Sequence, residues 1–214
     1  MTSLETPAIS PPPPAGELRG ADRSALLLRV AKLVCQSGEY PCLVRDVSWT
    51  GVRLRLFHAL PDERFIFLQL ANGELYPVEL MWAKDGQAGF RFTQQIDVSE
   101  FITEPSQWPR RPIRLNITAP GLAFVGSTAI SVNLKDLSQA GARIEAFGHM
   151  MIGQPLRLLI DGLPERWSRV AWRRGFDHGM AFEAKFKLDE LAAHALALQP
   201  LHPAAASDDD IKYA

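Results

Sequence analysis

The sequence contains no apolar run long enough to cross a membrane as a helix. Such a helix needs about 20 consecutive, predominantly apolar residues. Polar or charged side chains interrupt every apolar stretch of this 214-residue chain far earlier. The proline-rich first residues also lack the basic and then apolar order of a secretory signal peptide. We therefore expect a cytoplasmic protein without membrane insertion.

An excess of charge of one sign is equally absent. The chain carries 23 lysines and arginines against 24 aspartates and glutamates, so its formal net charge is −1. Proteins that bind nucleic acid nonspecifically depend on an extended basic surface. The balance therefore argues against nucleic-acid binding, but it permits a local arginine cluster that holds one small anionic ligand.

Cysteine is rare and metal-binding patterns are missing. Cys35 and Cys42 are the only cysteines, and no second cysteine pair or histidine pair stands at the spacing of a zinc site. The histidines occupy unrelated positions, namely His58, His149, His178, His194 and His202. We expect no metal site and interpret both cysteines as buried thiols. A disulfide stays open only if the two lie on facing strands.

Catalytic motifs are absent as well. The sequence has no glycine-rich phosphate loop ending in lysine and no serine nucleophile elbow. No set of catalytic residue types recurs along the chain. The predicted function is therefore binding rather than catalysis, and no cofactor is expected.

What the chain does contain is an internal repeat with an offset of 90 residues. An Asp-x-Ser-x-x-Gly segment begins at Asp46 and again at Asp136. The same offset relates Trp82 to Trp172, Gly89 to Gly179 and Phe92 to Phe182. The expected organisation is a proline-rich flexible N-terminus (1–17), a first barrel (18–102), a linker (103–109), a second barrel (110–198) and a flexible tail (199–214).

Strand periodicity dominates each copy. The residues after Gly51 alternate between apolar and arginine side chains, which is typical of a strand with one buried face. Five or six such short strands in each copy predict a closed barrel. Trp82 and Trp172 lie in apolar strands and are expected to anchor the two cores. Apolar residues at helical spacing within 188–198 predict a helix that caps the second barrel.

The repeated Asp-x-Ser-x-x-Gly segment is the first candidate for a binding site. It consists of Asp46, Ser48 and Gly51 in one copy and of Asp136, Ser138 and Gly141 in the other. Before an alternating strand, this pattern indicates a turn in which Asp and Ser bond to nearby backbone and Gly adopts a positive φ. Alone, such a turn requires no ligand.

An Arg-x-x-x-Arg motif upstream of each copy is the second candidate. It consists of Arg19 and Arg23 in the first copy and of Arg110 and Arg114 in the second. Guanidinium groups bind phosphate through parallel hydrogen bonds, stack on purines and pair with the O6 and N7 edge of guanine. Two arginines on a flexible segment therefore suit a guanine nucleotide. A solubilising basic linker is the alternative interpretation.

The order of these motifs, followed by Trp and Gly-x-x-Phe, resembles the PilZ domain in both copies, over about residues 19–102 and 110–198. The resemblance implies an all-β chain of two tandem six-stranded PilZ-like barrels with short C-terminal helices. It also implies a bacterial receptor or effector of the second messenger cyclic di-GMP. The implied ligand-binding residues are Arg19, Arg23, Asp46, Ser48, Gly51, Arg110, Arg111, Arg114, Asp136, Ser138 and Gly141. The arginines would hold phosphate and guanine, Asp and Ser would contact a guanine, and Gly would allow the turn and the close approach of the ligand.

The two copies are not equivalent. Arg23 and Asp46 are 23 residues apart, whereas Arg114 and Asp136 are 22 apart. One residue matters if it falls within a strand, because side chains alternate between faces. The first arginine pair also encloses Asp22, so the second site is favoured.

Ligand binding is expected to order the arginine segments and to change how the barrels contact each other or an unidentified protein partner. The alternative function is that of a degenerate PilZ adaptor, which binds another polypeptide and no nucleotide.

Overall fold

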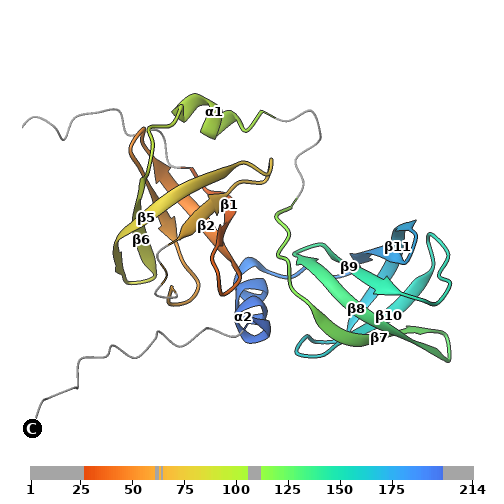
Figure 1. Cartoon of the computed structure of the whole chain (residues 1–214). Helices are drawn as coiled ribbons and strands as arrows, with labels where there is room; N and C mark the ends of the chain where they lie inside the picture. Colours follow the sequence, from red (N-terminus) through yellow and green to blue (C-terminus); the bar gives the residue numbers. More distant parts are fainter. Residues whose placement is uncertain (1–26, 61–62, 64, 106–111, 200–214) are drawn as a thin grey trace, which may run out of the picture.

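The computed structural model describes residues 27–60, 63, 65–105 and 112–199. These residues form two closed, six-stranded antiparallel β-barrels in tandem, shown in Figure 1. The predicted all-β fold of two six-stranded barrels is therefore confirmed. Predictions for residues 1–17, for the tail beyond 199, and for Arg19, Arg23, Arg110 and Arg111 fall outside the described residues.

Barrel 1 is built from the first six strands. They are β1 (Arg29–Val34), β2 (Glu39–Val47), β3 (Gly51–Arg55), β4 (Ile66–Gln69), β5 (Leu75–Lys84) and β6 (Gln87–Phe92). Around the barrel the order is β1, β2, β3, β6, β5 and β4, and β4 closes onto β1. Helix α1 (Val98–Thr103) follows, and the Asp97 side chain caps it by accepting from the N–H groups of Ser99 and Glu100.

Barrel 2 repeats this topology. Its strands are β7 (Ala119–Val125), β8 (Thr128–Ser138), β9 (Gly141–Ala146), β10 (Pro155–Ile160), β11 (Arg166–Arg174) and β12 (Asp177–Phe182). Helix α2 (Leu188–Leu198) covers the barrel by burying Leu191 and Ala195 in its core, as the helical spacing predicts. No helix within the described ranges has both the length and the apolar character needed to span a membrane.

The strand registers of the two barrels are superimposable at the offset of 90 residues. Arg29 lies opposite Val44 in barrel 1, and Ala119 lies opposite Leu134 in barrel 2. A β-bulge interrupts the pairing just before Asp46 and again just before Asp136. Because a bulge re-aims the side chain that follows it, both copies orient this aspartate by the same backbone irregularity.

Trp82 and Trp172 are not core residues, so that prediction is wrong. Their exposed fractions are 47% and 36%. Each indole lies across a glycine of the neighbouring strand, and a β-carbon added to Gly89 or Gly179 would come within 2.1 Å or 2.0 Å of the indole Nε1. The repeated Trp and Gly therefore form a unit in which the indole covers a position that has no side chain.

Both cysteines are free thiols of barrel 1. Cys42 is fully buried on β2, as predicted, whereas Cys35 stays partly exposed after β1. Burial, with a smaller contribution from Glu63, raises the pKa of Cys35 from 9.0 to about 12. Burial likewise raises the pKa of Cys42, so both sulfurs are protonated and poorly reactive at neutral pH.

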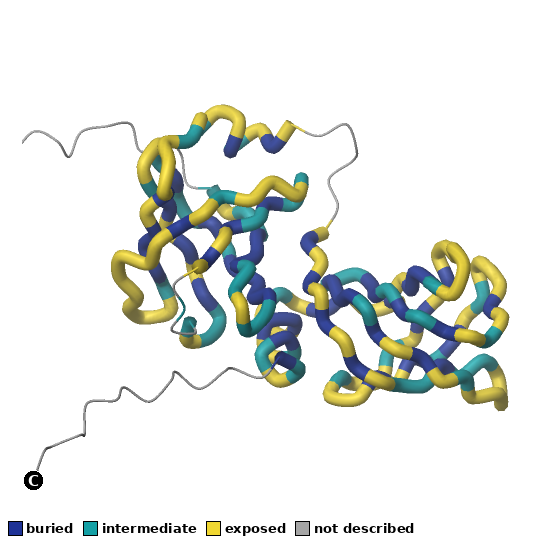
Figure 2. The backbone as a smooth tube through the Cα atoms, viewed as in Figure 1, coloured by how far each residue is buried: buried dark blue, intermediate teal, exposed yellow. Residues whose placement is uncertain are grey.

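Helix α2 lies between the barrels and contacts both, as Figures 1 and 2 show. Gln199, predicted to begin the flexible tail, is instead buried directly after this helix. Its side chain accepts a hydrogen bond from the Glu39 N–H at 2.7 Å and donates one to the Glu39 carbonyl at 2.9 Å. Val30 and Ala71 of barrel 1 also contact the apolar core of barrel 2, so the junction combines polar and apolar contacts.

Candidate functional site

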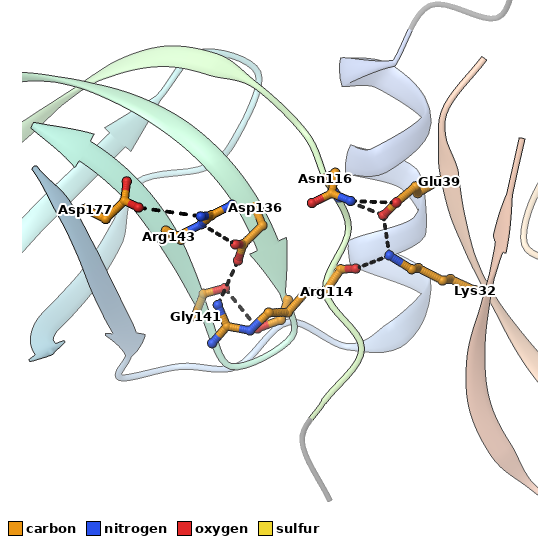
Figure 3. A network of polar contacts seen from close by, with 9 residues as sticks. Lys32, Glu39, Arg114, Asn116, Asp136, Gly141, Arg143 and Asp177 are labelled. Atoms are coloured by element: carbon orange, nitrogen blue, oxygen red, sulfur yellow. Dashed lines mark hydrogen bonds and ion pairs between the residues drawn. The ribbon is translucent and has the colours of Figure 1, made fainter. Parts of the chain in front are cut away.

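Asp136 lies near the end of β8 and is almost completely buried. Its Oδ1 accepts a hydrogen bond from Arg114 Nη1 at 2.8 Å, and its Oδ2 accepts one from Arg143 Nε at 2.7 Å. Arg143 also approaches Asp177 Oδ2 at 3.5 Å. Figure 3 shows the resulting chain of ion pairs on the outer face of barrel 2. One buried carboxylate thus fixes two guanidinium groups that remain open to solvent.

The two guanidinium groups have hydrogen-bonding capacity to spare. The Arg114 and Arg143 side chains are 45% and 37% exposed, against 8% for the Asp136 side chain. Each guanidinium has five N–H donors in a rigid fork, and the ion pairs use only some of them. This arrangement suits the recognition of a phosphate or a guanine edge by preorganised donors.

Apolar alternation places Arg114 at this position. Ile113, Leu115 and Ile117 are buried, so the intervening side chains project to the opposite side. Leu115 forms two backbone hydrogen bonds with Leu137, at 2.8 and 2.9 Å, which attaches the segment to β8. The segment that enters barrel 2 therefore pairs with β8 like a short additional strand, and this pairing places Arg114 next to Asp136.

The same segment is attached to barrel 1. Lys32 Nζ donates to the Arg114 carbonyl at 2.7 Å and to Glu39 Oε2 at 2.5 Å. Asn116 donates its backbone N–H and its Nδ2 to the two oxygens of Glu39, at 2.8 and 2.7 Å. Lys32 and Glu39 are both buried. We call these contacts of Lys32, Glu39, Arg114 and Asn116 the latch; Figure 3 shows it beside the Asp136 cluster.

Ser138 and Gly141 have structural contacts in the same turn. The Ser138 hydroxyl donates to the Gly141 carbonyl at 3.0 Å, and Ser138 is buried. Neither Gly141 nor its counterpart Gly51 has a positive φ, so that expectation is wrong. Glycine is required because the next strand approaches closely: an added β-carbon would lie 2.0 Å from the Met180 carbonyl oxygen or 2.7 Å from that of Phe90. The predicted contacts of Ser138, Gly141 and Gly51 with a ligand stay predictions.

The first copy repeats part of this arrangement. Asp46 pairs with Arg53, but the Asp46 side chain is 32% exposed. The Ser48 hydroxyl donates to the Gly51 carbonyl and accepts from the Gly51 N–H, both at 3.2 Å. Arg19 and Arg23 lie outside the described residues, so the structure brings together only Asp46, Ser48 and Gly51 of the predicted first site.

The one-residue difference between the copies lies upstream of the barrels. Arg114 precedes the start of β7 by five residues, whereas Arg23 precedes the start of β1 by six. The strand registers from there to the aspartates are the same. The residue in the first copy that corresponds to Arg114 is therefore Ser24, and the difference leaves the facing of every paired strand unchanged.

Sequence reasoning missed Arg143 and the latch. Arg143 and Arg53 occupy equivalent positions seven residues after each aspartate, and this repeated spacing was the available signal. Lys32 and Glu39 have no charged counterparts at the offset of 90, where Leu122 and Ala129 stand. Nothing in the repeat therefore indicated their role.

The described residues contain no group of three or more His, Cys, Asp or Glu side chains arranged to hold a metal ion. The charged groups of the candidate site are the arginines and aspartates already named, together with Lys32 and Glu39 of the latch.

No family model matches the chain, and no curated protein matches it. Among solved structures, the chain is similar to the PlzA protein of Borreliella burgdorferi in complex with c-di-GMP, at 11% identity and a TM-score of 0.33. This alignment covers 79% of this chain and 88% of that chain. It is also similar to K. pneumonia MrkH in its apo state, at 9% identity and a TM-score of 0.30, covering 80% and 86%. A third similar structure is YcgR from Escherichia coli in complex with c-di-GMP, at 11% identity and a TM-score of 0.27, covering 78% and 81%.

Proposed function

We propose that this chain is a receptor for cyclic di-GMP, with its principal site on barrel 2, and that it acts by binding rather than by catalysis. The observation that carries the proposal is that Asp136 holds the guanidinium groups of both Arg114 and Arg143. Arg114 belongs to the Arg-x-x-x-Arg motif and Asp136 to the Asp-x-Ser-x-x-Gly motif. The two halves of the PilZ-like pattern therefore contact each other directly.

The charges of this site suit a dianionic guanine nucleotide. Asp136 and Asp177 balance Arg114 and Arg143, and Arg110 and Arg111, which precede Arg114 in the sequence, are additional positive charges. Arginine recognises phosphate and the O6 and N7 edge of guanine through paired donors. Cyclic di-GMP offers both kinds of acceptor within one small ligand.

The latch provides a route from the ligand to the arrangement of the barrels. Lys32 of barrel 1 binds the carbonyl of Arg114, whose side chain contacts the proposed site. A ligand that draws Arg114 toward its phosphate favours arrangements in which this carbonyl leaves Lys32. Because a ligand shifts an equilibrium by its difference in affinity for the two states, binding would be relayed as a change in how the barrels contact each other.

A nucleotide-free adaptor is the second candidate function, and one observation favours it. Both oxygens of Asp136 already accept hydrogen bonds from arginines, so this carboxylate needs no ligand to balance its charge. In the adaptor function, the arginines only stabilise the surface of barrel 2 through their ion pairs, and a protein partner supplies the signal. Direct titration separates the two functions.

The test is calorimetric titration of the full chain with cyclic di-GMP, with cyclic di-AMP as the nucleotide control. We expect binding by wild type, and weakening by about tenfold to a hundredfold for Arg114→Ala, because a hydrogen bond to a charged group contributes about 1.5–3 kcal/mol. Arg110→Ala/Arg114→Ala should abolish the heat, and Arg19→Ala/Arg23→Ala reports on the first copy.

Arg157→Ala is the matched control, because Arg157 is a partly exposed arginine of barrel 2 that pairs with Glu165. Its affinity should equal that of wild type. Absence of binding by the folded wild-type chain would contradict the receptor function and leave the adaptor as the better account.

A further inference from the structure

Bulky apolar side chains are exposed at one end of barrel 2. Phe147, Met151, Ile152 and Phe176 have exposed fractions of 79%, 62%, 69% and 59%. We call these four residues the distal patch. Exposed apolar side chains that occur singly are ordinary, whereas a group of them indicates a surface that is covered by something else.

The distal patch is one surface because its loop runs along β11. The Ala146 N–H donates to the Phe176 carbonyl at 2.9 Å, and the Gly153 N–H donates to the Val170 carbonyl at 2.8 Å. The rings of Phe147 and Phe176 lie 4.9 Å apart. The loop between β9 and β10 and the turn between β11 and β12 therefore present their apolar side chains along a common edge.

Positive charge surrounds the distal patch. Arg173 Nη1 lies 2.5 Å from His149 Nδ1, and Arg169 Nη1 donates to the Gly153 carbonyl at 3.2 Å. Together with Arg174, these arginines form no ion pair within the described part of the chain. Neither residues 146–154 nor residues 166–176 include an acidic side chain. The adjacent acids, Glu145 and Asp177, are paired with Lys135 and Arg143.

Barrel 1 shows that the fold does not require this surface. At the offset of 90, the positions of Arg169, Arg173, Arg174 and Phe176 are held by Glu79, Ala83, Lys84 and Gly86. The strand and turn of barrel 1 that match residues 166–176 carry two acids and one base, against four arginines and no acid in barrel 2. The combination of apolar tips and arginines is therefore a property of the second copy alone.

We infer that the distal patch docks on a bilayer that contains anionic lipid. Met151 and Ile152 lie in a tight turn closed by the Gln154 N–H and the Met151 carbonyl at 3.0 Å, so they project as a tip that can enter the interface. The arginines around the tip then lie at the level of the lipid phosphates, where each basic side chain adds to the attraction. Charge complementarity with anionic headgroups is the feature that selects this partner.

A nucleic acid and a protein suit the surface less well. Met151 and Ile152 gain nothing against a phosphate backbone. A protein partner would need a matching pocket to receive this convex tip, whereas a bilayer needs none. The position also suits a flat partner, because β11 ends on the side of barrel 2 that faces away from barrel 1 and α2 in Figure 1.

The test is co-sedimentation of the full chain with vesicles, without nucleotide. One preparation contains equal amounts of phosphatidylcholine and phosphatidylglycerol, and the other contains phosphatidylcholine alone. We expect binding to the anionic vesicles only. Met151→Ser/Ile152→Ser should weaken it by at least about tenfold through loss of apolar insertion. Arg173→Ala/Arg174→Ala should weaken it by about thirtyfold, because each arginine contributes about 1 kcal/mol near an anionic surface.

Leu80→Ser/Met81→Ser on β5 of barrel 1 is the matched control, because it removes two exposed apolar side chains elsewhere. It should sediment like wild type, and circular dichroism should show that all three variants keep their strands. Equal sedimentation of wild type and both patch variants would overturn the inference. So would binding to a DNA duplex that competes with the vesicles and survives Met151→Ser/Ile152→Ser, since the surface would then recognise nucleic acid.

Discussion

Burial separates the two aspartates that the repeat places at equivalent positions. The Asp136 side chain is 8% exposed and contacts two arginines, whereas the Asp46 side chain is 32% exposed and contacts one. A charge pair in a desolvated setting is stronger, and the loss of one partner is more costly, because water cannot replace it fully. The same substitution should therefore have unequal consequences in the two barrels.

Asp136→Asn should lower the free energy of unfolding by about 2 kcal/mol, since Arg114 and Arg143 lose their shared counter-charge while staying partly solvated. Asp46→Asn, the matched variant, should lower it by about 0.5 kcal/mol or less, as for surface ion pairs. Urea denaturation of the two variants measures both values. Equal losses would contradict the importance that we attach to burial at Asp136.

The motifs identify part of the site because they keep a fixed order in the chain. Arg114 and Asp136 belong to recognisable motifs, and the structure places them in contact. Arg143 escapes detection because an arginine on an alternating strand also fits an ordinary solvent-facing side chain. Lys32 and Glu39 escape it because their partners lie on the other barrel, and contacts between domains leave no periodic signal in a sequence.

At the level of strands, period-two alternation and the repeat are sufficient to predict the barrels. They do not predict which face a tryptophan takes, because that depends on the residue opposite it on the next strand. Trp172 stays on the outer face since Gly179 offers a surface without a side chain. Gly141 serves a different purpose, because it lets β12 approach the start of β9.

Gly141→Ala and Gly179→Ala test these two uses of glycine. An added β-carbon at Gly141 would lie 2.0 Å from a backbone oxygen of β12, which cannot move without breaking strand pairing. At Gly179 it would meet the edge of the exposed Trp172 indole, which can swing into solvent. We expect a loss of about 3 kcal/mol or more for Gly141→Ala and about 1–2 kcal/mol for Gly179→Ala.

Thermal denaturation followed by circular dichroism ranks the two variants. Tryptophan fluorescence adds a second criterion, because Gly179→Ala should shift the emission to longer wavelength as an indole becomes more exposed, and Gly141→Ala should not. A larger loss of stability for Gly179→Ala than for Gly141→Ala would contradict the distinction between a movable ring and a fixed strand.

For the whole molecule, the latch determines how the barrels are held. Lys32 and Glu39 are buried, and they bind the segment that also carries Arg114 to barrel 2. Gln199 reinforces the junction from the end of α2 by bonding to the backbone of Glu39. Buried charges are costly unless they are paired, so this junction should open as a unit when one member is removed.

Lys32→Met removes the donor to the Arg114 carbonyl while keeping a long side chain, and it leaves Glu39 without its cation. We expect the barrels to separate while each stays folded, so the radius of gyration from small-angle scattering should rise with an unchanged circular dichroism spectrum. Lys135→Met is the matched control, because Lys135 forms a lysine–glutamate pair within barrel 2, with Glu145 at 3.0 Å. The scattering of Lys135→Met should equal that of wild type.

If the proposed receptor function holds, Lys32→Met should also bind cyclic di-GMP more tightly, because Arg114 no longer has to leave the latch before it engages a phosphate. An unchanged radius of gyration would show that the apolar contacts at the junction hold the barrels together without the latch.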